Sequence, residues 1–297
     1  MEDLTRPIFT FIHAPDAHLS ESFDALTPFI TSVHQEQYHP CPDFIVFGGD
    51  NINGSRDDGR VCEREMPILK EKLGTLKVPY HILCHNHDTW GEACRGEQYR
   101  LHFDNPFNYS THLSEDFVGI FMSGMYVDGD VSIKNAMDNA LWLDQTLGNI
   151  VDQKVLMFSH VPLFPPRKPV LSHVLPTLKR EGWEASRFGL QAEISKPFRD
   201  VIAKHGHVVA HYSGHCHVHS VTESRGTHYV TTASMASQPW EYRYIEVYAD
   251  RIVHRCICPH PLRKGEGFWT NCLNEDHPDV DIYHDGLSQE RDFGITY

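Results

Sequence analysis

The strongest constraint on the fold is a regular alternation of apolar runs with amphipathic stretches in the first 84 residues. Apolar runs at residues 8–14, 44–48 and 80–84 are separated by amphipathic stretches at 22–33 and 62–76. This is the β-α-β-α-β order of an α/β fold. Because the first two runs are apolar at successive positions, not at alternate ones, we expect central strands that are covered on both faces.

The pattern changes in the second half of the chain. Two further buried strands are predicted at residues 117–122 and 155–158, with a helix at 135–147 between them. Five prolines within 161–176 predict a loop, and a helix at 191–204 is predicted to meet an obstacle at Pro197. Close-spaced strands are then expected at 208–212, 227–232, 242–248 and 252–258, and their short links favour antiparallel pairing.

Size and charge limit the possible functions. At 297 residues, with 40% hydrophobic and 22% charged residues, the chain predicts one catalytic domain over 1–258 and a polar tail or arm over 259–297. A formal charge of -14 and the lack of a basic run argue against long nucleic acid as a partner. No apolar stretch is long enough for a membrane span and no signal segment opens the chain, so a cytoplasmic protein is expected.

Five polar motifs follow predicted strands, at the edge where open α/β sheets place their ligands. Taken singly, each is more typical of a turn or a hydrogen-bonded structural residue. Taken together, their carboxylate, imidazole and amide groups suit divalent Mn, Fe, Zn or Co. In chain order the motifs are Asp16-Ala17-His18, Gly49-Asp50-Asn51, Asn86-His87-Asp88, His160, and Gly214-His215-Cys216-His217.

This series of motifs resembles the pattern of the calcineurin-like metallophosphoesterase family. The resemblance implies a four-layer αββα sandwich of two mixed sheets, with two divalent metal ions at the sheet edge. Carried over to this sequence, it assigns the first ion to Asp16, His18, Asp50 and His217. It assigns the second ion to Asp50, Asn86, His160 and His215, so that Asp50 is shared.

The resemblance also implies a mechanism. A hydroxide held between two metal ions about 4 Å apart would attack the phosphorus atom. His87, beside Asn86, would act as the general acid towards the outgoing oxygen, and Asp88 would orient its imidazole. Asp88 also has a simpler interpretation as a turn cap, since aspartate commonly bonds nearby backbone N–H groups.

The sequence departs from the family pattern at His85, which stands where a glycine is usual. We expect either an outer structural role for this imidazole or a direct contact with substrate. Arg56 or Arg60, and Arg167 or Lys168, are candidates for phosphate contact, although such charges are more often solvated. Three residues near the last motif receive minor roles: Cys216 is expected to point away from the metals, and His211 and His219 to support the ligands.

Within the family, the chain looks most like phosphodiesterases that combine Asn-His-Asp with Gly-His-x-His. This resemblance implies hydrolysis of a small phosphodiester, of the cyclic nucleotide or glycerophosphodiester type. Two classes of the family fit less well. The motif of protein phosphatases has an arginine shortly after Gly-Asp, which this chain lacks after Gly49-Asp50, and purple acid phosphatases have a tyrosine ligand where Asn53 stands. A phosphomonoesterase or nucleotide pyrophosphatase with the same metals is the alternative, and a non-catalytic metal-binding scaffold is a third. The tail is a possible contact for a homo-oligomer.

Overall fold

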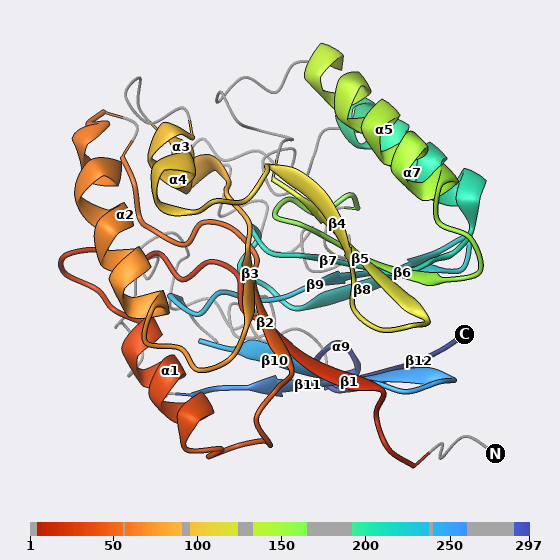
Figure 1. Ribbon diagram of the computed structural model, residues 1–297, viewed down its shortest axis with the longest axis horizontal. Helices are drawn as coiled ribbons and strands as arrows, with labels where there is room; N and C mark the ends of the chain where they lie inside the picture. The colour runs from red at the N-terminus through yellow and green to blue at the C-terminus, as the bar shows by residue number, and fades with distance from the viewer. Residues whose placement is uncertain are drawn as a thin grey trace, which may run out of the picture.

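The computed structural model describes residues 5–55, 57–90, 96–123, 133–164, 192–237, 240–259 and 288–297. Their strands form two six-stranded sheets (Figure 1). In the first sheet, β1, β2 and β3 are parallel, and β10, β11 and β12 extend it with antiparallel pairs. Its order is β12 (Phe293–Thr296), β11 (Arg251–Ile257), β10 (Tyr242–Val247), β1 (Phe9–His13), β2 (Phe44–Phe47) and β3 (Tyr80–Ile82).

The second sheet has a parallel centre and antiparallel edges. Strands β5, β6, β7 and β9 run parallel, whereas β4 and β8 pair antiparallel at the two edges. Its order is β4 (Asn108–His112), β5 (Phe117–Met122), β6 (Lys154–Ser159), β7 (Val208–Ser213), β9 (Thr227–Thr231) and β8 (Ser220–Ser224). Both sheets are therefore mixed, as predicted.

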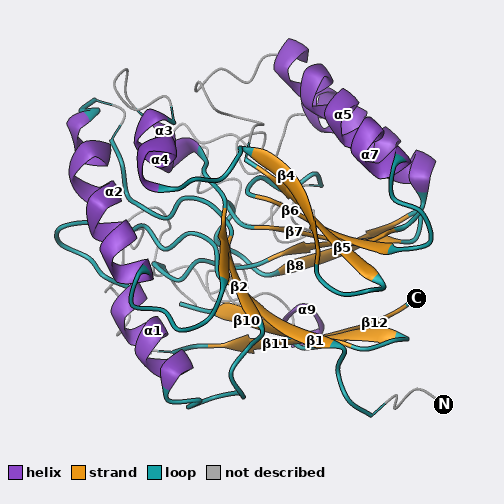
Figure 2. Cartoon of the chain, in the orientation of Figure 1, coloured by secondary structure: helices purple, strands orange, loops and turns teal. Residues whose placement is uncertain are grey.

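Helices cover the outer faces of the two sheets (Figure 2). Helices α1 (Leu26–His34) and α2 (Arg60–Leu73) share a core with the first sheet. Helices α5 (Ile133–Gly148) and α7 (Ala192–His205) share another with the second sheet. Short helices complete the described elements: α3 (Asn86–Thr89), α4 (Glu97–His102) and α9 (Ser288–Arg291). The four-layer αββα arrangement is confirmed.

A third core lies between the sheets and is rich in aromatic side chains. Phe11 of the first sheet meets Phe158 and Tyr212 of the second edge-on, at ring-centroid distances of 5.7 and 5.4 Å. Burying such a side chain contributes about 1.5–3 kcal/mol. These contacts hold β1 of the first sheet against β6 and β7 of the second.

Some predicted elements differ from the observed ones. Helix α7 continues through Pro197, because Phe198 and Ile202 bury their side chains against the second sheet and α5. The short strands β4, β8 and β12 were not predicted, and most of the proline-rich loop, residues 165–176, lies outside the described residues.

The tail joins the fold at its end. Strand β12 pairs with β11, and the buried Arg243 side chain donates to the backbone oxygens of Glu290 (2.7 Å) and Arg291 (2.8 Å). Residues 260–287 lie outside the described part, so the boundary at 258 stays a prediction. Within the described ranges, no helix is long and apolar enough to cross a membrane.

Candidate metal centre

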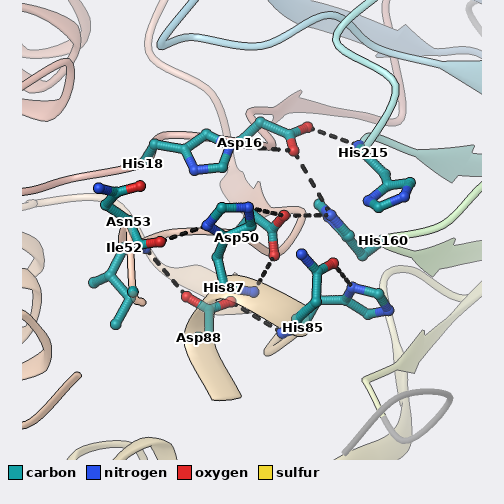
Figure 3. Close-up of polar contacts among 12 residues, drawn as sticks. Asp16, His18, Asp50, Ile52, Asn53, His85, His87, Asp88, His160 and His215 are labelled. Carbon is teal, nitrogen blue, oxygen red and sulfur yellow. Dashed lines mark hydrogen bonds and ion pairs between the residues drawn. The ribbon is translucent and has the colours of Figure 1, made fainter. Parts of the chain in front are cut away.

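The five motifs meet at the ends of strands from both sheets (Figure 3). The first sheet and its following loops supply Asp16, His18 and Asp50, and α3 supplies Asn86 and His87. The second sheet supplies His160 after β6, and His215 and His217 after β7. Ring nitrogens and carboxylate oxygens from these loops form several groups within which all the ligand atoms lie within 4.8 Å of one another. The structure therefore brings together residues nearly 200 positions apart in the chain.

Asp50 lies where these groups overlap. Its Oδ2 lies 3.0 Å from His160 Nε2 and 3.9 Å from His87 Nε2, while its Oδ1 accepts a hydrogen bond from the His87 backbone N–H (3.0 Å). It belongs to one ligand group with Asp16 and His160 and to another with His18 and His87. Burial disfavours its charge, but the neighbouring His160 and His87 rings outweigh this and hold the pKa of Asp50 well below its usual value.

Asp16 presents a buried oxygen to three imidazoles. Its Oδ2 accepts the backbone N–H of His215 at 2.9 Å, which ties β1 to the loop after β7. Its Oδ1 lies 3.3 Å from His217 Nε2, 3.6 Å from His160 Nε2 and 3.8 Å from His18 Nε2, and none of these contacts has hydrogen-bond geometry. A buried carboxylate oxygen normally has a partner. A divalent cation among these atoms would supply it, so the donor set fits a metal ion.

Five residues of the motifs adopt a left-handed backbone, which is uncommon outside glycine. The φ angles are 56° at Asp16, 42° at His18, 51° at Asp50, 67° at His215 and 55° at His217. Each such residue costs of order 1–3 kcal/mol and persists only when the surrounding structure fixes it. These residues turn the chain sharply after β1, β2 and β7 and direct carboxylates and imidazoles towards one point.

The motif glycines are needed for close approach. A Cβ atom at Gly214 would lie 2.4 Å from Asp16 Oδ2, and one at Gly49 would lie 2.8 Å from His160 Nδ1. Gly49 also has a φ of 96°, a conformation that side chains rarely adopt. The glycines in Gly-Asp and Gly-His-Cys-His thus make room for ligands supplied by other motifs.

Outer partners fix the orientation of two imidazoles. His160 donates from Nδ1 to the Gly48 carbonyl (2.8 Å), which leaves Nε2 facing the carboxylates. Burial lowers the pKa of His160, but Asp50 and Asp16 outweigh it and raise the value to about 9. His217 contacts Ser237 Oγ through Nδ1 (3.0 Å) and faces Asp16 with Nε2. Such a division of the two ring nitrogens is typical of metal-binding histidines.

His87 is held beside the cluster by its own contacts. Its Nδ1 donates to the carbonyl of Asn53, and its ring packs against Trp90 (centroids 3.6 Å apart) and edge-on to His18 (4.5 Å). Burial lowers the pKa of His87, and the nearby Asp50 carboxylate opposes this. With Nδ1 occupied, Nε2 is the nitrogen that faces the cluster.

Asp88 does not orient His87, contrary to the prediction. Its Oδ1 accepts hydrogen bonds from the backbone N–H groups of Asn51 (2.9 Å) and Ile52 (3.1 Å). Its Oδ2 accepts one from the backbone N–H of His85 (3.0 Å) and one from the side-chain amide of Asn51 (3.1 Å). The contacts of Asp88 are those of a buried loop clamp that joins the second motif to the third. They support the turn-cap interpretation.

Glu65, on α2, was missed by the sequence analysis. Its Oε2 accepts the Gly54 backbone N–H at 2.9 Å, next to the Asn53 carbonyl that holds His87. The signal was a charged residue within the buried stripe of α2, which otherwise consists of Cys62, Met66, Leu69 and Leu73. Glu65 therefore positions the loop that positions His87.

Glu65 gives a prediction about stability and pH. Burial raises the pKa of Glu65 to about 7, well above the value of an unfolded glutamate, although the Gly54 and Asn53 N–H groups oppose this. The folded state therefore binds the proton more tightly, and stability is lost as the pH rises towards and through 7. We expect the unfolding free energy of the wild type to fall relative to that of Glu65→Gln as the pH rises from 5 to 8. Denaturant unfolding of both proteins measures this difference. A difference that does not change with pH would contradict this.

The other candidates are an exposed arginine, three buried residues in or near the last motif, and residues outside the described ranges. Arg56, Arg167 and Lys168 fall among the residues that the structure does not describe. Arg60 has a side chain 82% exposed, 3.4 Å from Asp58, as expected for a solvated charge. Cys216 is buried, and burial raises its pKa well above the usual value, which does not favour a nucleophile. His211 contacts Ser159 (2.7 Å), and His219 contacts Glu241 (2.8 Å).

Comparison with known proteins agrees with this geometry. A family model for calcineurin-like phosphoesterases matches residues 9–219. The chain is 28% identical over 213 residues to a probable glycerophosphodiester phosphodiesterase GpdQ of Arcobacter nitrofigilis, covering 69% of this chain and 68% of the relative. It is 25% identical over 226 residues to a probable cyclic nucleotide phosphodiesterase of Moraxella catarrhalis, covering 72% and 73%.

Among solved structures, a dimetal phosphatase from Danio rerio superposes with a TM-score of 0.64. The superposition covers 98% of this chain and 99% of that one, at 16% sequence identity. At this identity the likeness concerns the fold alone. It extends over nearly the whole length of both chains.

Proposed function

Because this chain belongs to the calcineurin-like phosphoesterase family and is a metallophosphoesterase, we propose that it hydrolyses small phosphodiesters at a centre of two divalent ions. The substrate class is that of cyclic nucleotides or glycerophosphodiesters. The observation that carries the proposal is the place of Asp50, whose carboxylate belongs to two ligand groups at once. The names of two relatives, both phosphodiesterases, support the diester class.

The proposed ligands divide between the two ions around Asp50. The first ion takes Asp16, His18, Asp50 and His217, of which Asp16, His18 and His217 already form one group. The second takes Asp50, Asn86, His160 and His215; His160 Nε2 faces Asp50 at 3.0 Å. Bound there, Mn, Fe, Zn or Co would supply a water-derived nucleophile at neutral pH and offset charge on the phosphoryl group.

The charge balance of the site suits an anionic substrate. Only two carboxylates, Asp16 and Asp50, belong to the ligand set, so two dications leave the centre net positive. This local charge attracts phosphate even though the whole chain carries a formal charge of -14. A small diester can reach such a centre without the basic surface that long nucleic acid requires.

His87 is the proposed general acid. Its Nδ1 is committed to the Asn53 carbonyl, so Nε2 is the atom that gives a proton to the departing oxygen. To do so the ring must carry a proton on both nitrogens. The Asp50 carboxylate, 3.9 Å from Nε2, and the negative charge of a bound phosphate both favour that form.

The test is activity after removal and return of metal. We expect the chelated protein to regain hydrolysis of bis(p-nitrophenyl) phosphate with Mn, Fe, Zn or Co. In a panel of cyclic nucleotides, glycerophosphodiesters, phosphomonoesters and nucleotide diphosphates, a diester should have the highest kcat/KM. Asn86→Ala should abolish activity, whereas Asn149→Ala, at an exposed position after α5, should not.

Two results would contradict the proposal. A preference for monoesters or nucleotide diphosphates would mean that the same metal centre belongs to a phosphomonoesterase or nucleotide pyrophosphatase. A protein that binds metal yet hydrolyses none of the panel would instead be a scaffold of the same fold.

A further inference from the structure

The loop between β9 and β10 crosses from the second sheet to the first and touches two proposed ligands of the first ion. Its described residues are 232–237, 240 and 241. Ser237 Oγ lies 3.0 Å from His217 Nδ1. Ser234 Oγ donates to the backbone carbonyl of Asp16 at 2.8 Å. Both serines are buried, so these contacts belong to the interior of the protein and not to its surface.

The contact with Ser237 determines which nitrogen of His217 can bind a metal ion. His217 Nε2 lies 3.2 Å from His18 Nε2 and 3.3 Å from Asp16 Oδ1, so this nitrogen faces the other ligands. The Ser237 hydroxyl can accept a hydrogen bond from Nδ1–H, which leaves the lone pair of the neutral ring on Nε2. Partners of this kind fix both the tautomer and the orientation of a metal-binding histidine.

Glu241 anchors the end of this loop. Its Oε2 lies 2.8 Å from His219 Nε2, and its Oε1 accepts a hydrogen bond from the Arg291 guanidinium. Its backbone N–H donates to the Ser234 carbonyl at 3.3 Å, so the anchor is joined to the serine that holds Asp16. The preceding Trp240 has a left-handed backbone with a φ of 59°. Such a conformation persists only where the surrounding structure fixes it.

Arg291 comes from the C-terminal segment, where α9 contacts β11 of the first sheet and β8 of the second (Figure 1). The segment is held by contacts that do not involve the Arg291 side chain. Arg243 donates to the Arg291 carbonyl at 2.8 Å, and the Cys256 N–H donates to the Asp292 carboxylate at 2.9 Å. The Arg291 guanidinium can therefore be removed while these contacts keep the segment in place.

The second ion is supported by a different part of the chain. Its predicted ligand Asn86 has Oδ1 2.6 Å from His85 Nδ1, and the His85 backbone N–H donates to the Asp88 carboxylate at 3.0 Å. Its predicted ligand His160 donates from Nδ1 to the Gly48 carbonyl at 2.8 Å. These contacts do not involve the loop between β9 and β10. A change in that loop should therefore affect the first ion more than the second.

We propose that Ser237 is the positioning residue of His217, and that Arg291 fixes the loop on which Ser237 lies. This inference rests on the proposed two-metal function and concerns its first ion. Removing one partner of a buried ion pair leaves the other charge uncompensated. Without Arg291, the Glu241 carboxylate would have to move, and Ser237 would move with it. The first ion thus depends on a residue close to the end of the chain.

The test measures metal binding directly. Metal-free protein is equilibrated with Zn²⁺ against a competing chelator, and bound metal is counted. We expect the wild type to bind two ions, Ser237→Ala to lose about 10–100-fold in affinity for one of them, and Arg291→Gln to lose about tenfold. Ser237→Thr, which keeps the hydroxyl, and Arg291→Lys, which keeps the charge, should recover most of the loss.

Two matched controls should bind both ions as the wild type does. Ser110→Ala removes an exposed hydroxyl on β4. Arg255→Gln removes an arginine that is 49% exposed and pairs with Glu246 between β10 and β11.

A double-mutant cycle shows whether Ser237 acts through His217. In a His217→Ala background, Ser237→Ala should cause no further loss of affinity, whereas in an Asn86→Ala background it should cause the full loss. A further loss in the His217→Ala background would overturn the proposal. So would unchanged affinity in Ser237→Ala, or an equal loss of both ions with a lower denaturant midpoint. Wild-type protein that binds fewer than two ions would instead overturn the two-metal function, and this inference with it.

Discussion

Replacing Asp50 with asparagine should reduce kcat/KM by about 1000-fold or more, equivalent to about 4 kcal/mol of transition-state stabilisation. Asparagine keeps the shape of the side chain but removes the charge that faces His160 at 3.0 Å. Because Asp50 belongs to two ligand groups, the loss of its charge should weaken the binding of both proposed ions. Metal content and diesterase rate, measured on the same preparation, check this expectation.

The matched control is Asp250→Asn, in the turn between β10 and β11, where the side chain is 52% exposed and pairs with Arg251. This variant should retain both metal and rate, because exposed ion pairs contribute little. A folded Asp50→Asn protein with two bound ions and a rate near that of the wild type would show that Asp50 does not link the centre.

Gly214→Ala should lower the diesterase rate by about 100-fold although it adds only one methyl group at a position that carries no ligand. The new Cβ would lie 2.4 Å from Asp16 Oδ2 and 2.5 Å from Pro15 Cβ, closer than real contacts allow. Asp16 must then move, and a misplacement of about 1 Å can cost about 100-fold in rate. The strain of overpacking should also lower the unfolding free energy by about 1–3 kcal/mol.

Gly148→Ala is the control, since its Cβ would meet only the His205 ring at 3.7 Å, an ordinary contact at the end of α5. It should leave rate and metal content unchanged. If Gly214→Ala retained both ions and full activity, the loop after β7 would have to be more adaptable than its contacts with Asp16 imply.

Much of the fold could be predicted because its central strands are apolar at successive positions. Residues 117–122 were predicted as a strand, and β5 has those bounds. The convergence of the motifs also followed from the sequence, since the ends of parallel strands share one edge. The resemblance supplied the packing of two sheets, which periodicity alone does not determine.

The missed features depend on contacts between distant parts of the chain. β4 and β8 are short edge strands of mostly half-buried or exposed residues and lack a clear apolar pattern. β12 is set by pairing with β11 at the edge of the first sheet. Adjacency in sequence suggested that Asp88 serves His87, but its carboxylate accepts the backbone N–H groups of Asn51 and Ile52, which lie 37 and 36 residues earlier.

The two sheets each hold only part of the centre. Asp16 and Asp50 come from the loops of one sheet, whereas His160 and His215 come from those of the other. A folding intermediate in which only one sheet has formed would therefore lack a complete ligand set. Tight metal binding during folding would then indicate that the two sheets have packed together. For the same reason, a cation held by residues of both sheets would link them, and chelation should loosen the sandwich first at this edge.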